Sequence, residues 1–202
     1  MTSEKDFIEN KTNALKKFKK ALDEKMVDRG ISPILKIINN SENYYTSSSC
    51  FGRIVLLEIP EIGNKKEAKF LGKWHRKIRV NELISSLKNA KKGQLWILTQ
   101  SPIIHIGAKT NIAAEKILKT AISCGFKNSG IKSIGKKIIV EICSTERLDS
   151  PIGVDGVILC EKGHLSLLTD ISNNIIEKST LKLNKLKEKL RKDLSTQKTT
   201  QI

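Results

Sequence analysis

The amino-acid sequence predicts an α+β fold with a mixed or antiparallel sheet, covering helices, an internal duplication and no Rossmann topology. Segments of alternating apolar residues, typical of strands, are interspersed with segments of helical periodicity. No two of the 12 glycines stand at positions i and i+2, so the glycine-rich phosphate loop of a Rossmann fold is absent. The segments GRIVLLEI (52–59) and GKKIIVEI (135–142) share glycine, glutamate and isoleucine in register, which favours two copies of one α+β unit.

Helices are predicted where apolar residues recur three or four positions apart between charged residues. Pro33 stands at a favoured first-turn position of a short helix. Asn81 is the expected cap of the next helix, and Gly125 closes the one after it, because glycine readily adopts the left-handed conformation at a helix end. The predicted helices cover residues 4–26, 34–38, 82–90, 111–124 and 166–194.

Strands are predicted between turn residues, where apolar and β-branched residues alternate or cluster. A polar turn of serine, cysteine, phenylalanine and glycine interrupts the first strand segment, and Pro102 separates a later pair. The predicted strand segments are 44–59 (two strands), 71–80, 94–99, 103–107, 126–134, 137–143 and 154–160.

The 202 residues are expected to form one domain over residues 1–195, because no linker rich in serine, glycine or proline divides them. Its duplicated halves are expected at about 30–92 and 93–165, sharing one sheet, with the C-terminal helix 166–194 after them. The remaining tail, 196–202, is expected to fray.

The net charge of +16 points to a polyanionic partner, and RNA is the expected one. Residues 62–92 carry ten bases against two acids, and residues 178–198 carry eight against two. A solvated helix face is the alternative explanation for the second run. No apolar run is long enough to span a membrane, no signal peptide is evident, and the four cysteines lack CxxC spacing. We therefore expect a cytoplasmic protein.

Two polar turns carry the candidate binding chemistry. The first, at residues 46–53, contains hydroxyls, Cys50, Gly52 and Arg53; the second, at residues 125–130, has similar ingredients. Hydroxyls and turn amides can bind anions, and arginine can grip a carboxylate or phosphate with two hydrogen bonds. Plain hairpin turns are the alternative explanation.

These turns resemble those of the tRNA wybutosine-synthesising methyltransferase family of archaeal type. The resemblance is carried by SSCFGR (48–53), by Pro102 with His105, by GFKNSGI (125–131) and by Ser144-Thr145 with Pro151, in the same order. Phe51, Ser101 and Lys127 depart from the family pattern. The resemblance implies that S-adenosylmethionine methylates N-4 of a wyosine-type guanosine beside the anticodon of tRNA-Phe, within its anticodon stem-loop.

Site roles follow from the resemblance together with the residue chemistry. Methyl transfer to nitrogen needs positioning and, at most, a base, whereas a thiol nucleophile suits carbon methylation. No histidine pair has metal-ligand spacing, so no metal is expected. The predicted catalytic residues are His105, His75 and Arg53. The predicted cofactor-binding residues are Ser47, Ser48, Ser49, Gly52, Arg53, Asn128, Ser129 and Gly130. The predicted RNA-binding residues are Lys73, Trp74, Arg76, Lys77, Arg79, Lys127 and Lys185, with Trp74 as the stacking candidate.

Two other functions fit the same sequence features. A non-catalytic RNA-binding module could use both polar turns to grip phosphate. A different RNA enzyme could use Cys50 as a thiol nucleophile. Binding of S-adenosylmethionine without RNA would distinguish the methyltransferase from the module.

Overall fold

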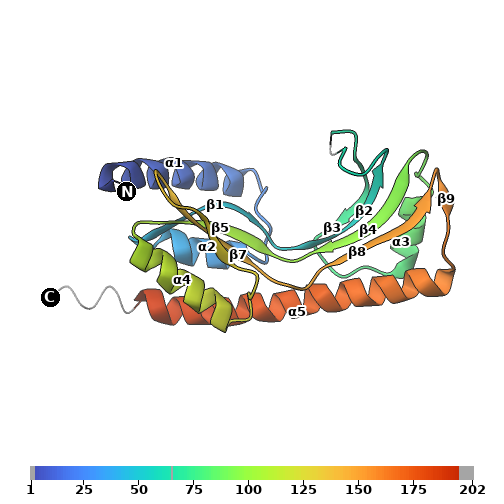
Figure 1. Cartoon of the computed structure of the whole chain (residues 1–202). Coiled ribbons are helices and arrows are strands. Elements are labelled where there is room, and N and C mark those ends of the chain that lie inside the picture. The colour runs from blue at the N-terminus through green and yellow to red at the C-terminus, as the bar shows by residue number, and fades with distance from the viewer. Residues whose placement is uncertain (1–2, 65, 196–202) are drawn as a thin grey trace. The chain divides into compact units, whose positions relative to one another are not determined.

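Two compact units, each assembled from separate chain segments, make up the described structure (Figure 1). The computed structural model describes residues 3–64 and 66–195. The first unit comprises residues up to 51, residues 102–145 and those from 180; the second comprises 52–101 and 146–179. Each unit therefore takes strands from both of the expected halves. The single domain over 1–195 and the duplication stay predictions, and the expected tail, 196–202, lies outside the described residues.

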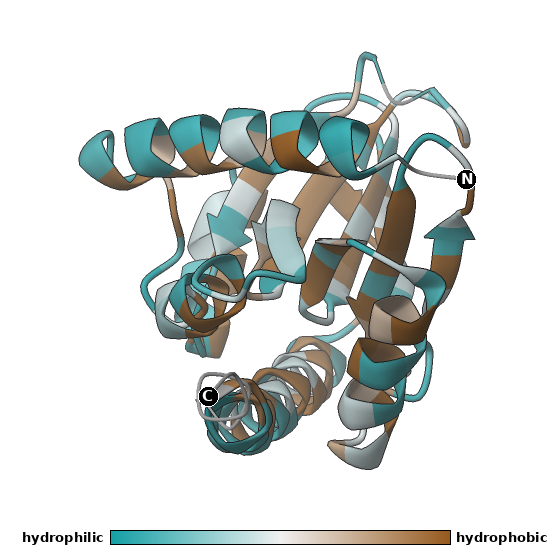
Figure 2. Cartoon of the chain, turned by 90° about the vertical axis from the view of Figure 1, so that its left-hand side faces the viewer, coloured by the Kyte–Doolittle hydropathy of each residue, from teal (hydrophilic) through white to brown (hydrophobic). Residues whose placement is uncertain are grey.

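The first unit contains a four-stranded antiparallel sheet in the order β1-β5-β7-β6. Figures 1 and 2 show α1 on one face of this sheet and α2, α4 and the end of α5 on the other. Its elements are α1 (Glu4–Asp23), α2 (Ser32–Asn39), β1 (Tyr44–Cys50), β5 (Ile103–Ala108), α4 (Asn111–Ser123), β6 (Gly130–Ser133) and β7 (Ile138–Cys143). The helix α5 spans Lys162–Ser195, and its residues from 180 onward belong to this unit.

Buried apolar residues at every second position of the two central strands, β5 and β7, form part of the core of the first unit. Ile104 and Ile106 of β5 and Val140 and Ile142 of β7 are fully buried and pack with apolar residues of α2, α4 and α5. The residues between them, including His105, therefore face the opposite side of the sheet. This pattern gives the sheet one apolar face and one face with polar side chains.

The second unit contains a five-stranded antiparallel sheet in the order β3-β2-β4-β8-β9. One face of it packs on α3 and on the first part of α5, with Ile54 and Leu56 of β2 in the core. Its other elements are β2 (Arg53–Ile59), β3 (Lys69–Trp74), α3 (Val80–Leu87), β4 (Gln94–Gln100), β8 (Leu148–Val154) and β9 (Val157–Ile158).

The α+β class and the absence of Rossmann topology are confirmed, but one shared sheet is not what forms. The two similar segments become β2 and β7, which lie in different sheets. Their aligned glutamates differ as well. Glu58 is buried and accepts hydrogen bonds from the backbone N–H groups of Lys91 (2.5 Å) and Lys92 (3.2 Å), whereas Glu141 contacts side chains.

Three predicted strand segments are wrong, and local hydrogen bonds explain two of them. Instead of one strand over 154–160, the chain forms β8, which ends at Val154, and the two-residue strand β9, because residues 155–156 form a turn between them. The strand expected over 71–80 ends at Trp74, and α3 begins at Val80 with Arg79 as its cap residue in place of Asn81. The carboxylate of Glu82 accepts the backbone N–H of Arg79 at 2.9 Å, which satisfies a donor at the helix start. The strand expected over 126–134 shrinks to β6, because residues before Gly130 form a turn.

Other helix ends agree with the sequence. Gly125, after α4, has a φ of +98°, the left-handed conformation expected there. Ser3 caps α1: its Oγ accepts the backbone N–H of Asp6 at 3.0 Å. Among the described residues, no helix is both long enough and apolar enough to cross a membrane.

Candidate functional site

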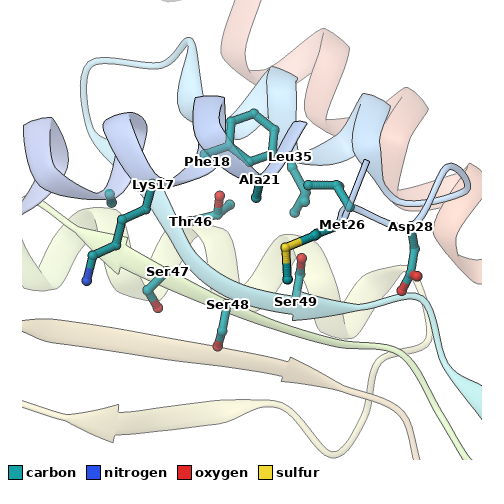
Figure 3. A pocket seen from close by; sticks show the side chains of 12 residues that line it. Lys17, Phe18, Ala21, Met26, Asp28, Leu35, Thr46, Ser47, Ser48 and Ser49 are labelled. Atoms are coloured by element: carbon teal, nitrogen blue, oxygen red, sulfur yellow. The ribbon is translucent and has the colours of Figure 1, made fainter. Parts of the chain in front are cut away.

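A cavity of about 290 Å³ lies in the first unit between α1, the loop after α1 and the edge strand β1 (Figure 3). We call it the serine cavity, because Ser47, Ser48 and Ser49 of β1 line it. Its other lining residues are Ala14, Lys17, Phe18, Ala21, Met26, Val27, Asp28, Leu35 and Thr46. The cavity therefore has a wall of hydroxyls, an apolar wall, one cation and one carboxylate.

The strand β1 is buried at its start and exposed from Ser47 to Ser49, so its three serines are accessible. Tyr44, Tyr45 and Thr46 are buried, whereas Ser47, Ser48 and Ser49 are exposed. The pairing with β5 shifts between Thr46 and Ser48, which marks a β-bulge. Bulges re-aim side chains and are common beside active sites, so the irregular register explains how consecutive serines reach one cavity.

Thr46 anchors the buried end of this segment. Its backbone N–H donates to Oδ1 of Asn39 on α2 at 2.7 Å, and Nδ2 of Asn39 donates to Oγ1 of Thr46 at 2.9 Å. At the other end of β1, the carboxylate of Asp28 accepts the backbone N–H of Phe51 at 2.9 Å. Both ends of the serine segment are thus held by hydrogen bonds from outside the strand.

A chain of hydrogen bonds leads from the cavity to a partly buried carboxylate. Oγ of Ser48 lies 2.7 Å from Nδ1 of His105, and Nε2 of His105 lies 2.7 Å from Oε2 of Glu141. Nζ of Lys132 lies 2.8 Å from the other oxygen of Glu141. The side chain of Glu141 is 15% exposed and that of His105 is 30% exposed, so Ser48 connects the cavity to a partly desolvated pair.

The charge on Glu141 determines which nitrogen of His105 carries the proton. Burial raises the pKa of Glu141, but hydrogen bonds from Lys132 and His105 outweigh it, so the net pKa is lowered. The pKa of Lys132 is raised by the same hydrogen bond. Glu141 is therefore an acceptor, and Nε2–H of His105 donates to it. In this tautomer Nδ1 can accept a hydrogen bond from the hydroxyl of Ser48.

Strand pairing places several predicted site residues in one row across the sheet. Ser48 of β1 pairs with His105 of β5, which pairs with Glu141 of β7, which pairs with Gly130 of β6. Directly paired residues share a face of the sheet. A Cβ on Gly130 would meet nothing within 4 Å, so this end of the row is open. The structure thus brings together Ser48, His105 and Gly130 from three distant segments.

Ser129, which was predicted to bind the cofactor, holds the second polar turn in place through hydrogen bonds. Ser129 Oγ donates to the carbonyl of Phe126 at 2.7 Å and accepts the backbone N–H of Cys143 at 3.1 Å. This hydroxyl ties the turn to β7, which is a structural task. Its neighbours Lys127 and Asn128 are exposed.

Three of the predicted catalytic and cofactor-binding residues belong to the second unit instead. Gly52 has a φ of +98° where the chain enters that unit, a conformation that favours glycine. Arg53 begins β2, and its Nε–H donates to Oε1 of Gln100 at 2.7 Å. His75 is half-buried after the end of β3.

The basic residues of the second unit differ in their partners. Arg76 forms an ion pair with Glu82 at 2.6 Å, and Lys77 forms one with Glu177 at 2.6 Å. Lys73 is exposed. Paired cations must exchange a carboxylate for a phosphate, so these ion pairs oppose RNA binding by Arg76 and Lys77.

The remaining RNA-binding predictions are distributed over both units. Trp74 is half-buried and packs against the core of the second unit, with its ring where a Cβ on Gly72 would lie. Arg79 is exposed at the start of α3, and Lys185 is exposed on the part of α5 in the first unit.

The substitution Glu82→Gln is expected to flatten the acid side of the stability curve. Hydrogen bonds from Arg76 and from the backbone of Arg79 lower the pKa of Glu82 from 4.5 to about 2. A carboxyl whose pKa is lower in the folded state stabilises the fold above its unfolded pKa. This contribution is complete above pH 4.5 and is lost as pH falls towards about 2. Thermal unfolding between pH 2 and 6 measures it, with Glu61→Gln in an exposed loop as control. Identical pH dependence in parent and Glu82→Gln would contradict the assignment.

Sequence reasoning missed the apolar wall of the cavity and four charged residues of the site: Glu141, Lys132, Asp28 and Lys17. The signal for Glu141 was present, since an acid alternates with isoleucine and valine in a strand of a strongly basic chain. Nothing in the sequence marked the other three, because lysines are abundant and Asp28 lies in a loop.

The fold and the site define an α+β protein outside the Rossmann class, with a cavity joined by hydrogen bonds to His105 and Glu141. The chain belongs to the family described as Methyltransferase TYW3, which matches residues 9–192. It is accordingly a methyltransferase, as the resemblance of the two polar turns implied.

Curated relatives and solved structures agree with this assignment. A Pyrococcus horikoshii protein named tRNA(Phe) 7-((3-amino-3-carboxypropyl)-4-demethylwyosine(37)-N(4))-methyltransferase 1 is 46% identical over 92% of this chain and 95% of its own. A Methanocaldococcus jannaschii enzyme of the same function is 43% identical over 86% and 91%. A solved Pyrococcus horikoshii structure, of the PH1069 protein, superposes with a TM-score of 0.89 at 45% identity, covering 92% of this chain and 96% of that one. A hypothetical protein from Aeropyrum pernix superposes at 0.71 with 26% identity over 82% and 98%.

Proposed function

We propose that this protein uses S-adenosylmethionine to methylate N-4 of the wyosine-type guanosine beside the anticodon of tRNA-Phe. The observation that carries the proposal is the 46% identity to an enzyme named for this reaction, over nearly the full length of both chains. The family assignment favours an enzyme over the non-catalytic RNA-binding module. The site supports it with a cavity and an acid–base residue joined by hydrogen bonds.

The serine cavity has the chemistry to hold the cofactor. Phe18, Leu35 and Met26 offer apolar surface for an adenine ring, and the serine hydroxyls offer donors and acceptors for polar groups. The carboxylate of Asp28 can accept hydrogen bonds from ribose hydroxyls. The volume of the serine cavity, about 290 Å³, is at the lower end of the range for ligand pockets. We therefore expect the cavity to enclose part of the cofactor. S-adenosylmethionine supplies a methyl group activated by its sulfonium.

The hydrogen-bond chain can remove the proton from the target nitrogen. When the methyl group transfers to N-4 of the guanosine derivative, its bond to the sulfonium breaks and S-adenosylhomocysteine would leave as the neutral thioether. The proton of N-4 can pass to Oγ of Ser48, whose own proton passes to Nδ1 of His105. The resulting imidazolium faces the Glu141 carboxylate, which stabilises the positive charge. Return of the proton from His105 to solvent restores the site. Positioning of the two substrates supplies the rest of the rate enhancement.

The predicted partner and location extend the proposal. The anticodon stem-loop of tRNA-Phe presents single-stranded bases, and the lysines supply charge for its phosphates. Asn128 and Gly130 remain proposed cofactor contacts, Lys127 and Lys185 proposed phosphate contacts, and His75 and Arg53 proposed catalytic residues. A cytoplasmic location and a reaction without metal stay predictions.

Mass analysis of nucleosides tests the proposed reaction. Purified protein is incubated with S-adenosylmethionine and tRNA-Phe that carries the demethylated wyosine nucleoside, and the nucleosides are then separated and weighed. We expect the modified nucleoside to gain one methyl group, and tRNA-Phe with unmodified guanosine at that position to gain none. A nucleoside that gains no methyl group, in a protein that binds the cofactor, would contradict the proposal.

Replacing Cys50 with serine is expected to keep methyl transfer within about tenfold of the parent rate. A nitrogen nucleophile needs no covalent adduct with the enzyme, and serine preserves the size and hydrogen bonding of this position. The thermal transition first shows that Cys50→Ser is folded, and single-turnover rates of methyl transfer are then compared between the variant and the parent. Loss of turnover in folded Cys50→Ser would make the thiol-dependent RNA enzyme the better explanation.

A further inference from the structure

An exposed aromatic ring lies beside two cations on the sheet of the second unit. Phe70 of β3 is 56% exposed, although phenylalanine is usually buried. The guanidinium carbon of Arg53 lies 5.7 Å from the ring centroid, and Nζ of Lys73 lies 5.8 Å from it. Both distances are within the range of cation–π contact, about 6 Å. We call these three residues the Phe70 platform.

Strand register places the platform on the face of the sheet away from its helices. The core residues Ile54 and Leu56 of β2 face α3 and α5. The β2 residues that alternate with them face the other way, and these include Arg53 and the pairing partners of Phe70 and Lys73. The three side chains thus share one sheet face, as do the aromatic and basic residues of sheet proteins that bind single-stranded RNA.

The cations of the platform are better prepared to contact phosphate than their neighbours. The Nε–H of Arg53 is held by a neutral amide, that of Gln100, so its charge is not neutralised by that contact. Lys73 is exposed beside the ring. In contrast, Arg76 and Lys77 already form ion pairs with carboxylates. Positive charge is therefore concentrated where an aromatic face is also exposed.

We infer that the Phe70 platform binds one unpaired RNA nucleotide, with the base stacked on Phe70 and its phosphates beside Arg53 and Lys73. Stacking on an aromatic ring tolerates any base, and cations next to the ring match the adjacent phosphates. The inference rests on the proposed function for the identity of the partner as RNA. It assigns to Phe70 the stacking role that the sequence suggested for Trp74, whose ring packs on the core.

Binding of a labelled octa-adenylate, followed by fluorescence anisotropy, tests the platform. Phe70→Ala is expected to weaken binding about tenfold, because one base–aromatic stack contributes about that much affinity. Phe70→Trp, which keeps a stacking surface, should stay within about twofold of the parent. Leu167→Ala is the matched control, since Leu167 of the same unit is 54% exposed on α5. It should leave binding unchanged.

Salt dependence distinguishes stacking from charge. Phe70→Ala removes no charge and should keep the slope of log affinity against log salt. Lys73→Gln should reduce that slope by about 0.7, the value for one phosphate contact on a single strand. An eight-base-pair RNA duplex offers no splayed base, so its affinity should not change in Phe70→Ala.

The binding experiment can fail or succeed independently of the proposed methyl transfer. Parent-like affinity of folded Phe70→Ala for octa-adenylate would overturn the platform, whether or not the parent methylates tRNA-Phe. Tenfold weaker binding with rescue by Phe70→Trp would support the platform even if nucleoside analysis shows no methyl transfer. Equal weakening by Phe70→Ala and Leu167→Ala would also overturn it, because exposure alone would then explain the loss.

Discussion

Replacing His105 with alanine is expected to lower kcat for methyl transfer about 100- to 10,000-fold, the usual contribution of a general base. Ser48 and Glu141 hold the ring through both nitrogens, so its loss removes the proton acceptor. Binding of S-adenosylmethionine should change little, because His105 does not line the serine cavity. Single-turnover rates with saturating substrates, together with calorimetry of cofactor binding, measure the two effects separately.

Two further variants make this prediction specific. Glu141→Gln should lower kcat at least about tenfold, because the neutral amide no longer enforces the Nε2–H tautomer of His105 or stabilises the imidazolium. His164→Ala, on the exposed start of α5, should match the parent. If His75→Ala abolishes turnover while His105→Ala does not, the base is His75, and the hydrogen-bond chain of the first unit has a structural role.

Replacing Ala21 with tryptophan is expected to weaken S-adenosylmethionine binding about 100-fold or more. Ala21 lines the serine cavity from α1, and an indole there would occupy much of its 290 Å³. The part of the cofactor that the cavity is expected to enclose cannot enter a pocket that is already filled. Calorimetric titration of the cofactor without RNA measures the loss directly.

A matched substitution controls for the added ring. Thr12→Trp places the same side chain on the exposed face of α1 and should leave cofactor binding unchanged. Both variants should unfold near the parent temperature, since neither removes a core residue. Parent-like cofactor affinity in folded Ala21→Trp would place the cofactor elsewhere, and residues of the second polar turn, such as Asn128 and Gly130, would then be the next to test.

Local sequence patterns predicted most helices and strands, because periodicity and capping residues act over a few positions. The long helix was expected over 166–194 and forms over Lys162–Ser195, and Gly125 ends α4 as expected. Two of the errors arose where a nearby side chain formed a hydrogen bond with the backbone. Glu82 accepts the backbone N–H of Arg79 and starts α3 early, and Ser129 holds a turn where a strand was expected.

The sequence by itself determined the α+β class, the absence of a Rossmann loop, the methyltransferase family and the serine segment. Each of these depends on residue types at fixed short spacings, which are readable without the fold. Only the tertiary structure decided that β2 and β7 belong to different sheets and that each unit combines distant segments. It also decided that His105 lies between Ser48, 57 positions away, and Glu141, 36 positions away. Strand partners and register are chosen by long-range packing of the apolar faces, and a shift of one residue would turn these side chains into the core.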